Sequence, residues 1–390
     1  MSISTSIERR AIITVASIFS LRMLGLFMVY PVFAIYAFQL RNSTPVLVGL
    51  ALGIYGLTQA LFQIPFGFAS DRLGRKPLIM FGLSLFILGS VIAALSDSIY
   101  GVVIGRCLQG MSAIGSVMMA LVADLTRETV RARAMAVMGI TIGLSFALAM
   151  VLGPVLGDWA GVQGIFWLMA VFGALAMLLL WVLVPDPNRS LGPDLTKPIR
   201  ASLLKVLANQ ELLQLNLGVL VLHASLVALF LKIPGTLVEL GFEGGTVWRF
   251  YLVLIVSSLL TAPPLLLWLE KKTAANRKVG LLVFTLLLSE GGFYCFHKSM
   301  LGVGISLWMF FSAFNCLEAS LPSLVSKLAS SRERGTALGI YSSVQFIGLF
   351  LGGLAGGWLD KDYGMVGVLG FCMMLAMGWL VSITVNLRGY

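Results

Sequence analysis

Long, nearly uncharged apolar segments recur along the whole chain, and they constrain its fold more than any other feature. A helix that spans a lipid bilayer needs about 20 consecutive, mostly apolar residues, and such segments recur twelve times here. Only 11% of the residues are charged, whereas a soluble domain carries roughly 25%. Because so few charges cannot cover a soluble surface, we predict an all-α membrane protein that is solvated mostly by lipid.

The twelve predicted transmembrane helices divide into two sets of six. The first set lies at 11–38, 45–69, 77–96, 98–123, 134–157 and 164–184, and the second at 210–231, 247–269, 279–296, 300–326, 335–358 and 364–387. A polar segment that contains several prolines separates the sets. We therefore predict an N-terminal six-helix bundle at 1–184, a cytoplasmic linker at 185–209 and a C-terminal six-helix bundle at 210–390.

Basic residues are distributed unequally between the two sides of this topology. With a cytoplasmic N-terminus, twenty of the 27 Lys and Arg residues fall in cytoplasmic loops and termini. Five fall on the opposite side: Arg41, Lys232, Arg249, Lys298 and Lys361. Cytoplasmic loops are enriched in Lys and Arg, so we predict that both termini are cytoplasmic, and the short loops favour a bacterial inner membrane. The asymmetry explains the net charge of +10 without a nucleic acid partner.

The two halves share features at positions six helices apart. Pro65 precedes Asp71 by six residues at the end of the second helix, and Pro264 precedes Glu270 by six residues at the end of the eighth. Internal repeats with a site at their interface are typical of secondary transporters. We therefore expect two pseudo-symmetric bundles around a central cavity, in a monomer that moves a small solute across the bilayer.

Enzymatic and metal-binding functions find no support in the sequence. The four cysteines lie in apolar segments without CxxC spacing, so a disulfide or zinc framework is not expected. We see no metal-ligand triad, nucleotide loop or nucleophile–base arrangement. We therefore expect no catalytic residue, no metal and no cofactor, with the proton as the coupling ion.

The loop after the second helix has an unusual spacing of glycines and charges: Gly67-Phe-Ala-Ser-Asp71-Arg72-Leu-Gly74-Arg75-Lys76. The Asp71 carboxylate suits the donors of a tight turn, and Gly74 permits the bend. We expect Arg75 to pair with Asp124 at the cytoplasmic end of the fourth helix, as a latch that holds one conformation and releases in another. The alternative is an ordinary solvated basic loop.

This loop resembles the signature loop of the major facilitator superfamily, whose members have twelve helices in two six-helix bundles. Two further motifs carry the resemblance: Arg106-Cys-Leu-Gln109-Gly110 and Ala149-Met-Val-Leu-Gly153-Pro154-Val-Leu-Gly157. The first resembles the fourth-helix motif of proton-coupled members, and the second resembles the fifth-helix motif of drug–proton antiporters. The second match is imperfect, because Ala149 and Asp158 stand where that motif has glycine.

Within the superfamily, the segments FSLRMLGLFMVYPVF and GIYGLTQALFQIPFG are similar to the YajR branch. Members of this branch often carry a soluble C-terminal domain, which we expect to be absent because the chain stops at Tyr390, just past the last helix. The resemblance implies that the fifth-helix stripe of small residues is a seam between the bundles. Ordinary close packing of helices explains the same residues equally well.

Ionisable residues inside the predicted spans are the main candidates for function. A charge at the bilayer centre costs about 2.5–3.5 kcal/mol on insertion scales, and Arg22, Arg106, His223 and Glu318 lie on the first helices of the four three-helix units. In the resembled superfamily these helices line the central cavity. Glu290 is the exception, on a peripheral helix, and we expect it near the outer interface.

We assign roles to these residues as hypotheses. Glu318 is our first candidate for the proton carrier, with His223 and Glu290 as alternatives. Arg22 and Arg106 are expected to keep a fixed cavity charge, Arg22 as a partner of Glu318, because guanidinium does not deprotonate. A structural ion pair is the alternative for each. The substrate-binding candidates are Tyr30, Tyr55, Gln59, Gln109, Asn216 and Asn315.

We favour proton-driven antiport that exports small hydrophobic or amphipathic molecules by alternating access. A proton symporter or uniporter for a metabolite remains the alternative within transport. A membrane scaffold or sensor that transports nothing is the alternative of another class.

Overall fold

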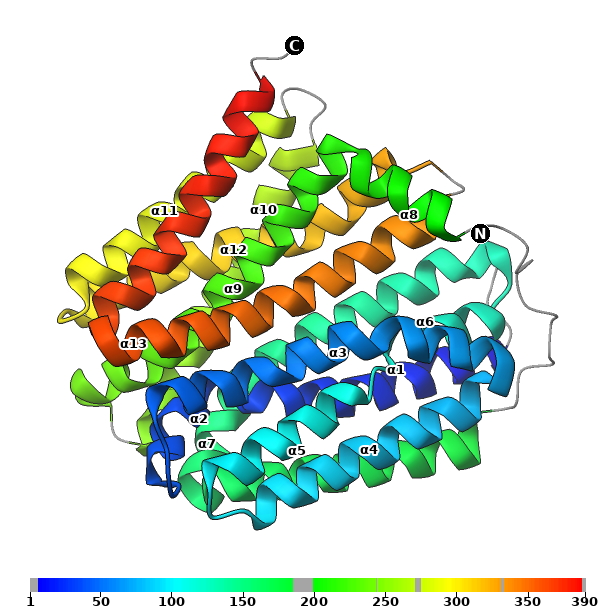
Figure 1. The fold of residues 1–390 in the computed structure, drawn as a ribbon, viewed down its shortest axis with the longest axis horizontal. Helices are drawn as coiled ribbons and strands as arrows, with labels where there is room; N and C mark the ends of the chain where they lie inside the picture. The colour runs from blue at the N-terminus through cyan, green and yellow to red at the C-terminus, as the bar shows by residue number, and fades with distance from the viewer. Residues whose placement is uncertain (1–5, 185–198, 243, 271–274, 331–332, 388–390) are drawn as a thin grey trace. The chain divides into compact units, whose positions relative to one another are not determined.

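The computed structural model describes residues 6–184, 199–242, 244–270, 275–330 and 333–387. Every regular element within them is a helix (Figure 1). One isolated β-bridge joins Arg41 to Ser98. A chain in lipid must satisfy its backbone N–H and C=O groups internally, which a helix does within one segment. The predicted all-α membrane fold is confirmed.

The first half contains α1 (Ser6–Met28), α2 (Tyr30–Tyr36), η1 (Ala37–Gln39), α3 (Pro45–Leu73), α4 (Arg75–Leu95), α5 (Ile99–Met111), α6 (Gly115–Asp124) and α7 (Glu128–Leu183). The second half contains α8 (Ile199–Ala208), α9 (Gln210–Glu239), η2 (Gly244–Thr246), α10 (Val247–Glu270), α11 (Ala275–Phe296), α12 (Met300–Leu328) and α13 (Arg334–Leu387). Of the predicted linker, residues 185–198 lie outside the described residues, and the next residues form α8, which the sequence analysis did not predict.

Two helices are too long to be single spans. At 1.5 Å per residue, the 56 residues of α7 correspond to about 84 Å, more than twice the ~30 Å hydrocarbon core. The helical path breaks at Gly161 in α7 and at Gly364 in α13, where φ is 66° and 59°. Each of the two therefore holds two spans. The ten continuous candidate spans among the described residues thus correspond to the twelve predicted ones.

The chain forms two compact units. The first unit comprises residues 1–43 and 54–196, and the second comprises residues 44–53 and 197–390. The start of α3 therefore groups with the second half. The predicted bundle boundaries at 184 and 210 stay a prediction.

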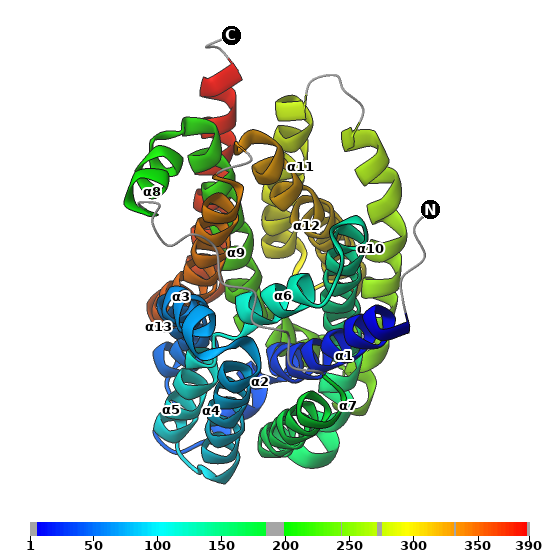
Figure 2. The same cartoon turned by 90° about the vertical axis from the view of Figure 1, so that its right-hand side faces the viewer.

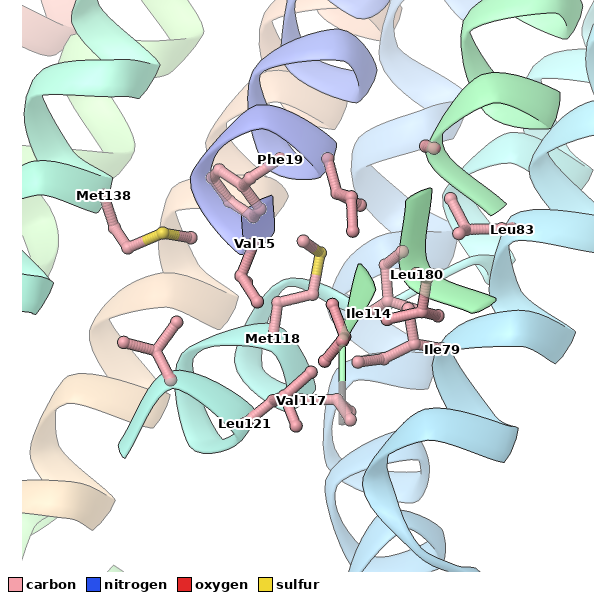
Figure 3. Close-up of a cluster of buried hydrophobic side chains, with 14 of the residues drawn as sticks. Val15, Phe19, Ile79, Leu83, Ile114, Val117, Met118, Leu121, Met138 and Leu180 are labelled. Atoms are coloured by element: carbon pink, nitrogen blue, oxygen red, sulfur yellow. The ribbon is translucent and has the colours of Figure 1, made fainter. Parts of the chain in front are cut away.

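The first unit is built on two close helix pairs, α1 with α7 and α4 with α5. Figure 2 shows α4 beside α5, where Gly89 and Gly105 face each other so closely that a Cβ atom on either would collide with the carbonyl oxygen of the other. Apolar side chains of α1, α4, α6 and α7 fill the centre of this unit (Figure 3). Its core includes Val15, Phe19, Ile79, Met118 and Leu180.

The second unit repeats these pairings with its own helices. In it α9 packs on α13, and α11 packs on α12. Gly348 and Gly352 of α13 lie against the carbonyl oxygens of Leu220 and Ala224 on α9, so a side chain at either glycine would meet backbone. The pairs α1–α7 and α9–α13 join equivalent spans of the two halves, which supports the internal repeat.

Candidate functional site

A polar cluster surrounds two buried arginines inside the first unit. Arg22 of α1 is fully buried, and its Nη2 donates to the Tyr55 hydroxyl and to Gln59 Oε1, both at 3.1 Å. Arg106 of α5 is also buried and donates to Gln109 Oε1 at 3.0 Å. Its guanidinium carbon lies 5.1 Å from the centroid of the Tyr55 ring, within the range of a cation–π contact. Tyr55 therefore contacts both cations, through its hydroxyl and through its ring.

A break between α5 and α6 supplies a further acceptor to this cluster. Ser112 has φ −69° and ψ 57°, outside the helical region, and helix resumes only at Gly115. Arg22 Nη2 donates to the Ser112 carbonyl at 2.8 Å. The sequence analysis predicted one continuous helix at 98–123, and this prediction is wrong at residues 112–114. The break permits Arg22 to bind a backbone oxygen that a regular helix would occupy.

Gln109 extends the cluster to α4 because its Nε2 donates to Ser90 Oγ at 2.9 Å. Ser90 in turn donates to the Phe86 carbonyl at 2.7 Å. The predicted substrate-binding residues Tyr30, Tyr55, Gln59 and Gln109 are all buried in the first unit. Three of them, Tyr55, Gln59 and Gln109, accept hydrogen bonds from the arginines.

A second cluster, called here the His–Gln–Glu cluster, joins His223 of α9, Glu318 of α12 and Gln345 of α13. Gln345 Nε2 lies 2.7 Å from His223 Nε2 and 3.1 Å from Glu318 Oε1. His223 Nε2 is 3.7 Å from Glu318 Oε2. The His223 side chain is 8% exposed and that of Glu318 is 36% exposed, so the carboxylate is the more accessible proton acceptor of the two. Phe314 lies beside the imidazole, with ring centroids 5.7 Å apart.

One arrangement of hydrogens fits these distances when the imidazole is neutral. His223 Nδ1 donates to the Val219 carbonyl at 3.1 Å, which leaves a lone pair on Nε2. Gln345 Nε2 donates one hydrogen to that lone pair and the other to Glu318 Oε1. The assignment follows from the hydrogen-bond network. The amide of Gln345 thus bridges a neutral imidazole and an ionised carboxylate.

Glu290 of α11 does not reach the outer interface, and that expectation is wrong. Its side chain is 1% exposed, and neither carboxylate oxygen has a hydrogen-bond partner among the described residues. The Ser225 hydroxyl and the Cys372 thiol lie close to it. The helix is packed on α12 and α13, which bury the carboxyl group rather than expose it. A carboxyl group in such apolar surroundings carries a large desolvation penalty when it is ionised.

The two remaining substrate-binding candidates lie in the second unit. Asn216 of α9 is buried, and its Oδ1 has no partner in the described part of the chain. Asn315 of α12 donates to Ser258 Oγ at 3.4 Å. Neither forms a hydrogen bond with the His–Gln–Glu cluster among the described residues.

The loop between α3 and α4 carries the predicted pair of charges. Arg75 Nε donates to Asp124 Oδ2 at 3.1 Å, and the Arg75 guanidinium also pairs with Asp71 and donates to Ser70. Gly74 has φ 99°, a conformation that favours glycine. A Cβ atom on Gly67 would meet nothing within 4 Å. Arg72 lies over the Phe68 ring at 4.2 Å.

Gly153 and Gly157, which belong to the predicted fifth helix, lie in the first span of α7 and face α1 and α2 of their own unit. A Cβ atom on Gly153 would lie 2.7 Å from the Met28 carbonyl oxygen, and one on Gly157 would lie 3.0 Å from Val32. Ala149 and Pro154 of the same helix are buried. These contacts are those of close packing within one unit, and the seam between bundles stays a prediction.

The sequence analysis assigned no role in the clusters to Ser90, Ser112 or Gln345. A buried serine or glutamine in a span is common, so its type alone carries no signal. Only the tertiary contacts reveal the role of these residues, because Ser112 and Gln345 each contact an ionisable group that is distant in the sequence.

Comparisons with known proteins identify a family for the chain. A sequence profile of the Major Facilitator Superfamily matches residues 15–353. The chain is 42% identical to the inner membrane transport protein YajR of Escherichia coli (strain K12) over 374 residues, which cover 96% of this chain and 82% of YajR. It is 26% identical to the multidrug resistance protein MdtH of Yersinia enterocolitica, over 91% of this chain and 90% of MdtH.

A solved structure shares the fold at much lower identity. The nucleoside transporter NupG superposes with a TM-score of 0.75 at 13% identity, over 98% of this chain and 99% of NupG. At this identity the similarity concerns the fold alone. The twelve spans, the two halves and the paired helices are those of a multi-pass membrane transporter.

Proposed function

The chain belongs to the major facilitator superfamily, and on that premise we propose that it is a proton-coupled antiporter. It exports small hydrophobic or amphipathic solutes by alternating access, with the His–Gln–Glu cluster as its proton site. The similarity to a multidrug resistance protein supports the export of such solutes. Symport and uniport remain the alternatives that the experiments below distinguish.

The observation that carries the proposal is the shared amide of Gln345. Two groups that accept protons, His223 and Glu318, lie in membrane spans and bind the same amide nitrogen. A proton on His223 Nε2 removes the lone pair to which Gln345 donates. The amide must then turn its oxygen toward the imidazolium, or the imidazolium must pair directly with Glu318 across the present 3.7 Å.

A proton on Glu318 has a different consequence for the same amide. The neutral carboxyl group carries a hydroxyl donor, so the amide no longer binds a charged acceptor at Oε1. Each protonation state therefore has its own set of partners on α9, α12 and α13. Because these partners belong to different helices, proton binding changes the free energy of one helix arrangement relative to another.

The proton gradient supplies enough free energy for this work. One elementary charge that crosses a potential of 100 mV releases about 2.3 kcal/mol. A tenfold solute gradient requires about 1.4 kcal/mol. One proton per solute therefore supports accumulation of more than tenfold.

The test is solute flux in proteoliposomes under an imposed pH gradient, with a panel of neutral, anionic and cationic aromatic solutes. Wild-type flux of the transported members should follow the gradient. Glu318→Gln should fold and still bind these solutes but should not concentrate them. Glu239→Gln removes an exposed carboxylate at the end of α9 and is the matched control. Normal accumulation by Glu318→Gln would assign the proton to another group.

The placement of the protein is part of the proposal. We infer a bacterial inner membrane, both termini in the cytoplasm and a monomer as the functional unit. The similarity to an inner membrane transport protein supports the first inference, and the distribution of Lys and Arg supports the second. The proposal requires no catalytic residue, metal or organic cofactor.

A further inference from the structure

Arg22 retains hydrogen-bond donors that nothing in the described chain satisfies. All three acceptors around it, the Tyr55 hydroxyl, the Gln59 carbonyl and the Ser112 carbonyl, lie at Nη2. Its Nε and Nη1 are buried and have no hydrogen-bond partner among the described residues. Nε carries one hydrogen and Nη1 carries two, so most of the donors of a fully buried guanidinium have no acceptor.

The charge of Arg22 is also uncompensated. It forms no ion pair with any carboxylate of the described residues. The acidic side chains described in the first unit lie near the ends of its spans: Glu8, Asp71, Asp97, Asp124, Glu128 and Asp158. Four of them are in ion pairs with other arginines, and the remaining two are exposed. The neutral acceptors around Arg22 lower the desolvation penalty but supply no negative charge.

Arg106 adds a second positive charge to the same cluster, through Tyr55. A membrane span retains two buried cations only if something offsets them, because ionisable residues in spans pair with one another or mark the path of a substrate. A guanidinium binds carboxylates and other oxyanions through several parallel N–H donors. The positive potential and the unsatisfied donors together fit an oxyanion.

The aromatic side chains around Arg22 indicate the chemistry of the rest of the molecule that carries this oxyanion. The Phe86 ring lies 5.8 Å from the Arg22 guanidinium carbon, and the Tyr55 ring lies between the two arginines. An aromatic or aliphatic body would be desolvated against such neighbours. Hydrated inorganic anions lack that contribution.

We propose that Arg22 is the centre of an anion-binding subsite, and that the exported solutes carry a carboxylate or another oxyanion on an apolar body. The inference rests on the proposed transport function, of which it specifies the substrate class. Because Arg22 is fully buried here, the solute reaches it in another state of the transport cycle.

The test is equilibrium binding to the purified protein in detergent at constant pH, with 2-naphthoate and its neutral isostere 2-naphthamide as probes. Wild-type protein should bind 2-naphthoate at least tenfold more tightly than 2-naphthamide. Arg22→Gln should lose this preference, whereas Arg22→Lys, which keeps the charge, should retain part of it. Arg9→Gln removes an exposed arginine of the same helix and should bind as wild type.

Equal affinity of the wild-type protein for the two probes would overturn the subsite, and this result does not depend on any variant folding. An unchanged preference in folded Arg22→Gln would overturn it as well. The measurement involves no gradient, so it is independent of coupling. A protein that keeps the 2-naphthoate preference while its solute flux ignores the pH gradient would contradict the proton coupling alone.

Discussion

The proposed proton chemistry depends on one residue, Gln345, through its side-chain amide. In the hydrogen-bond arrangement described above, it donates to both His223 Nε2 and Glu318 Oε1. Sequence analysis predicted both ionisable groups because a charge in a span is costly. It could not predict the bridge, because the bridge requires α9, α12 and α13 to bring together residues up to 122 positions apart.

Removal of this amide should weaken proton-driven transport. In Gln345→Leu, His223 and Glu318 lose the donor that they share, and a hydrogen bond to a charged group contributes about 1.5–3 kcal/mol. We expect solute accumulation under a fixed pH gradient to fall about tenfold, since about 1.4 kcal/mol corresponds to a factor of ten. Gln210→Leu, at an exposed glutamine of α9, is the control. Unchanged accumulation by folded Gln345→Leu would remove Gln345 from the proton site.

At the scale of the elements, the sequence predicted where most helices lie but not how they are interrupted or extended. The predicted seventh helix ends at 231, whereas α9 continues to Glu239. Lys232 and Pro234 resemble a helix end in the sequence, but Lys232 pairs with Asp360 at 2.5 Å, and the proline is accommodated inside the helix. The hydropathy of the sequence does not reveal tertiary contacts of this kind.

Close helix packing predicts that alanine substitutions at two glycines of α13 have different effects on stability. A Cβ atom at Gly352 would collide with the Ala224 carbonyl oxygen, whereas one at Gly339 would meet nothing within 4 Å. Gly352→Ala should destabilise the protein by about 1–3 kcal/mol. Gly339→Ala should be neutral or stabilising, because alanine favours helix by up to about 1 kcal/mol. Thermal unfolding in detergent measures both, and equal melting temperatures would contradict the packing.

The ion pair between Arg75 and Asp124 predicts that substitutions of the two residues have non-additive effects on the conformational balance. In the latch hypothesis, loss of this partly exposed pair shifts the balance of conformations by up to about 1 kcal/mol, or roughly two- to fivefold. Arg75→Gln should change the labelling rate of Thr129→Cys at least as much as Asp124→Asn, because Arg75 also pairs with Asp71. The double variant should change the rate no more than Arg75→Gln alone, in a background without native cysteines. Additive effects of the two single changes would show that the residues act independently.

At the scale of the whole molecule, the sequence predicted twelve spans in two related halves because the bilayer imposes length and hydropathy on each helix. We infer which side of the membrane each loop faces from the positions of Lys and Arg. An impermeant maleimide should therefore label Thr129→Cys only from the cytoplasmic side and Asp362→Cys only from the opposite side. Both positions are exposed. Labelling of both from one side would contradict the topology.

The most direct test of proton-coupled antiport uses the efflux of a solute to drive protons into the liposome. Proteoliposomes are loaded with a solute that the wild-type protein transports and that stays charged at every working pH, such as an aryl sulfonate if anions are accepted. The internal pH is then followed as the solute leaves. Proton-coupled antiport predicts that the interior acidifies, and that neither Glu318→Gln nor protein-free liposomes show this change. An interior that turns alkaline, or solute efflux without any pH change, would contradict the account.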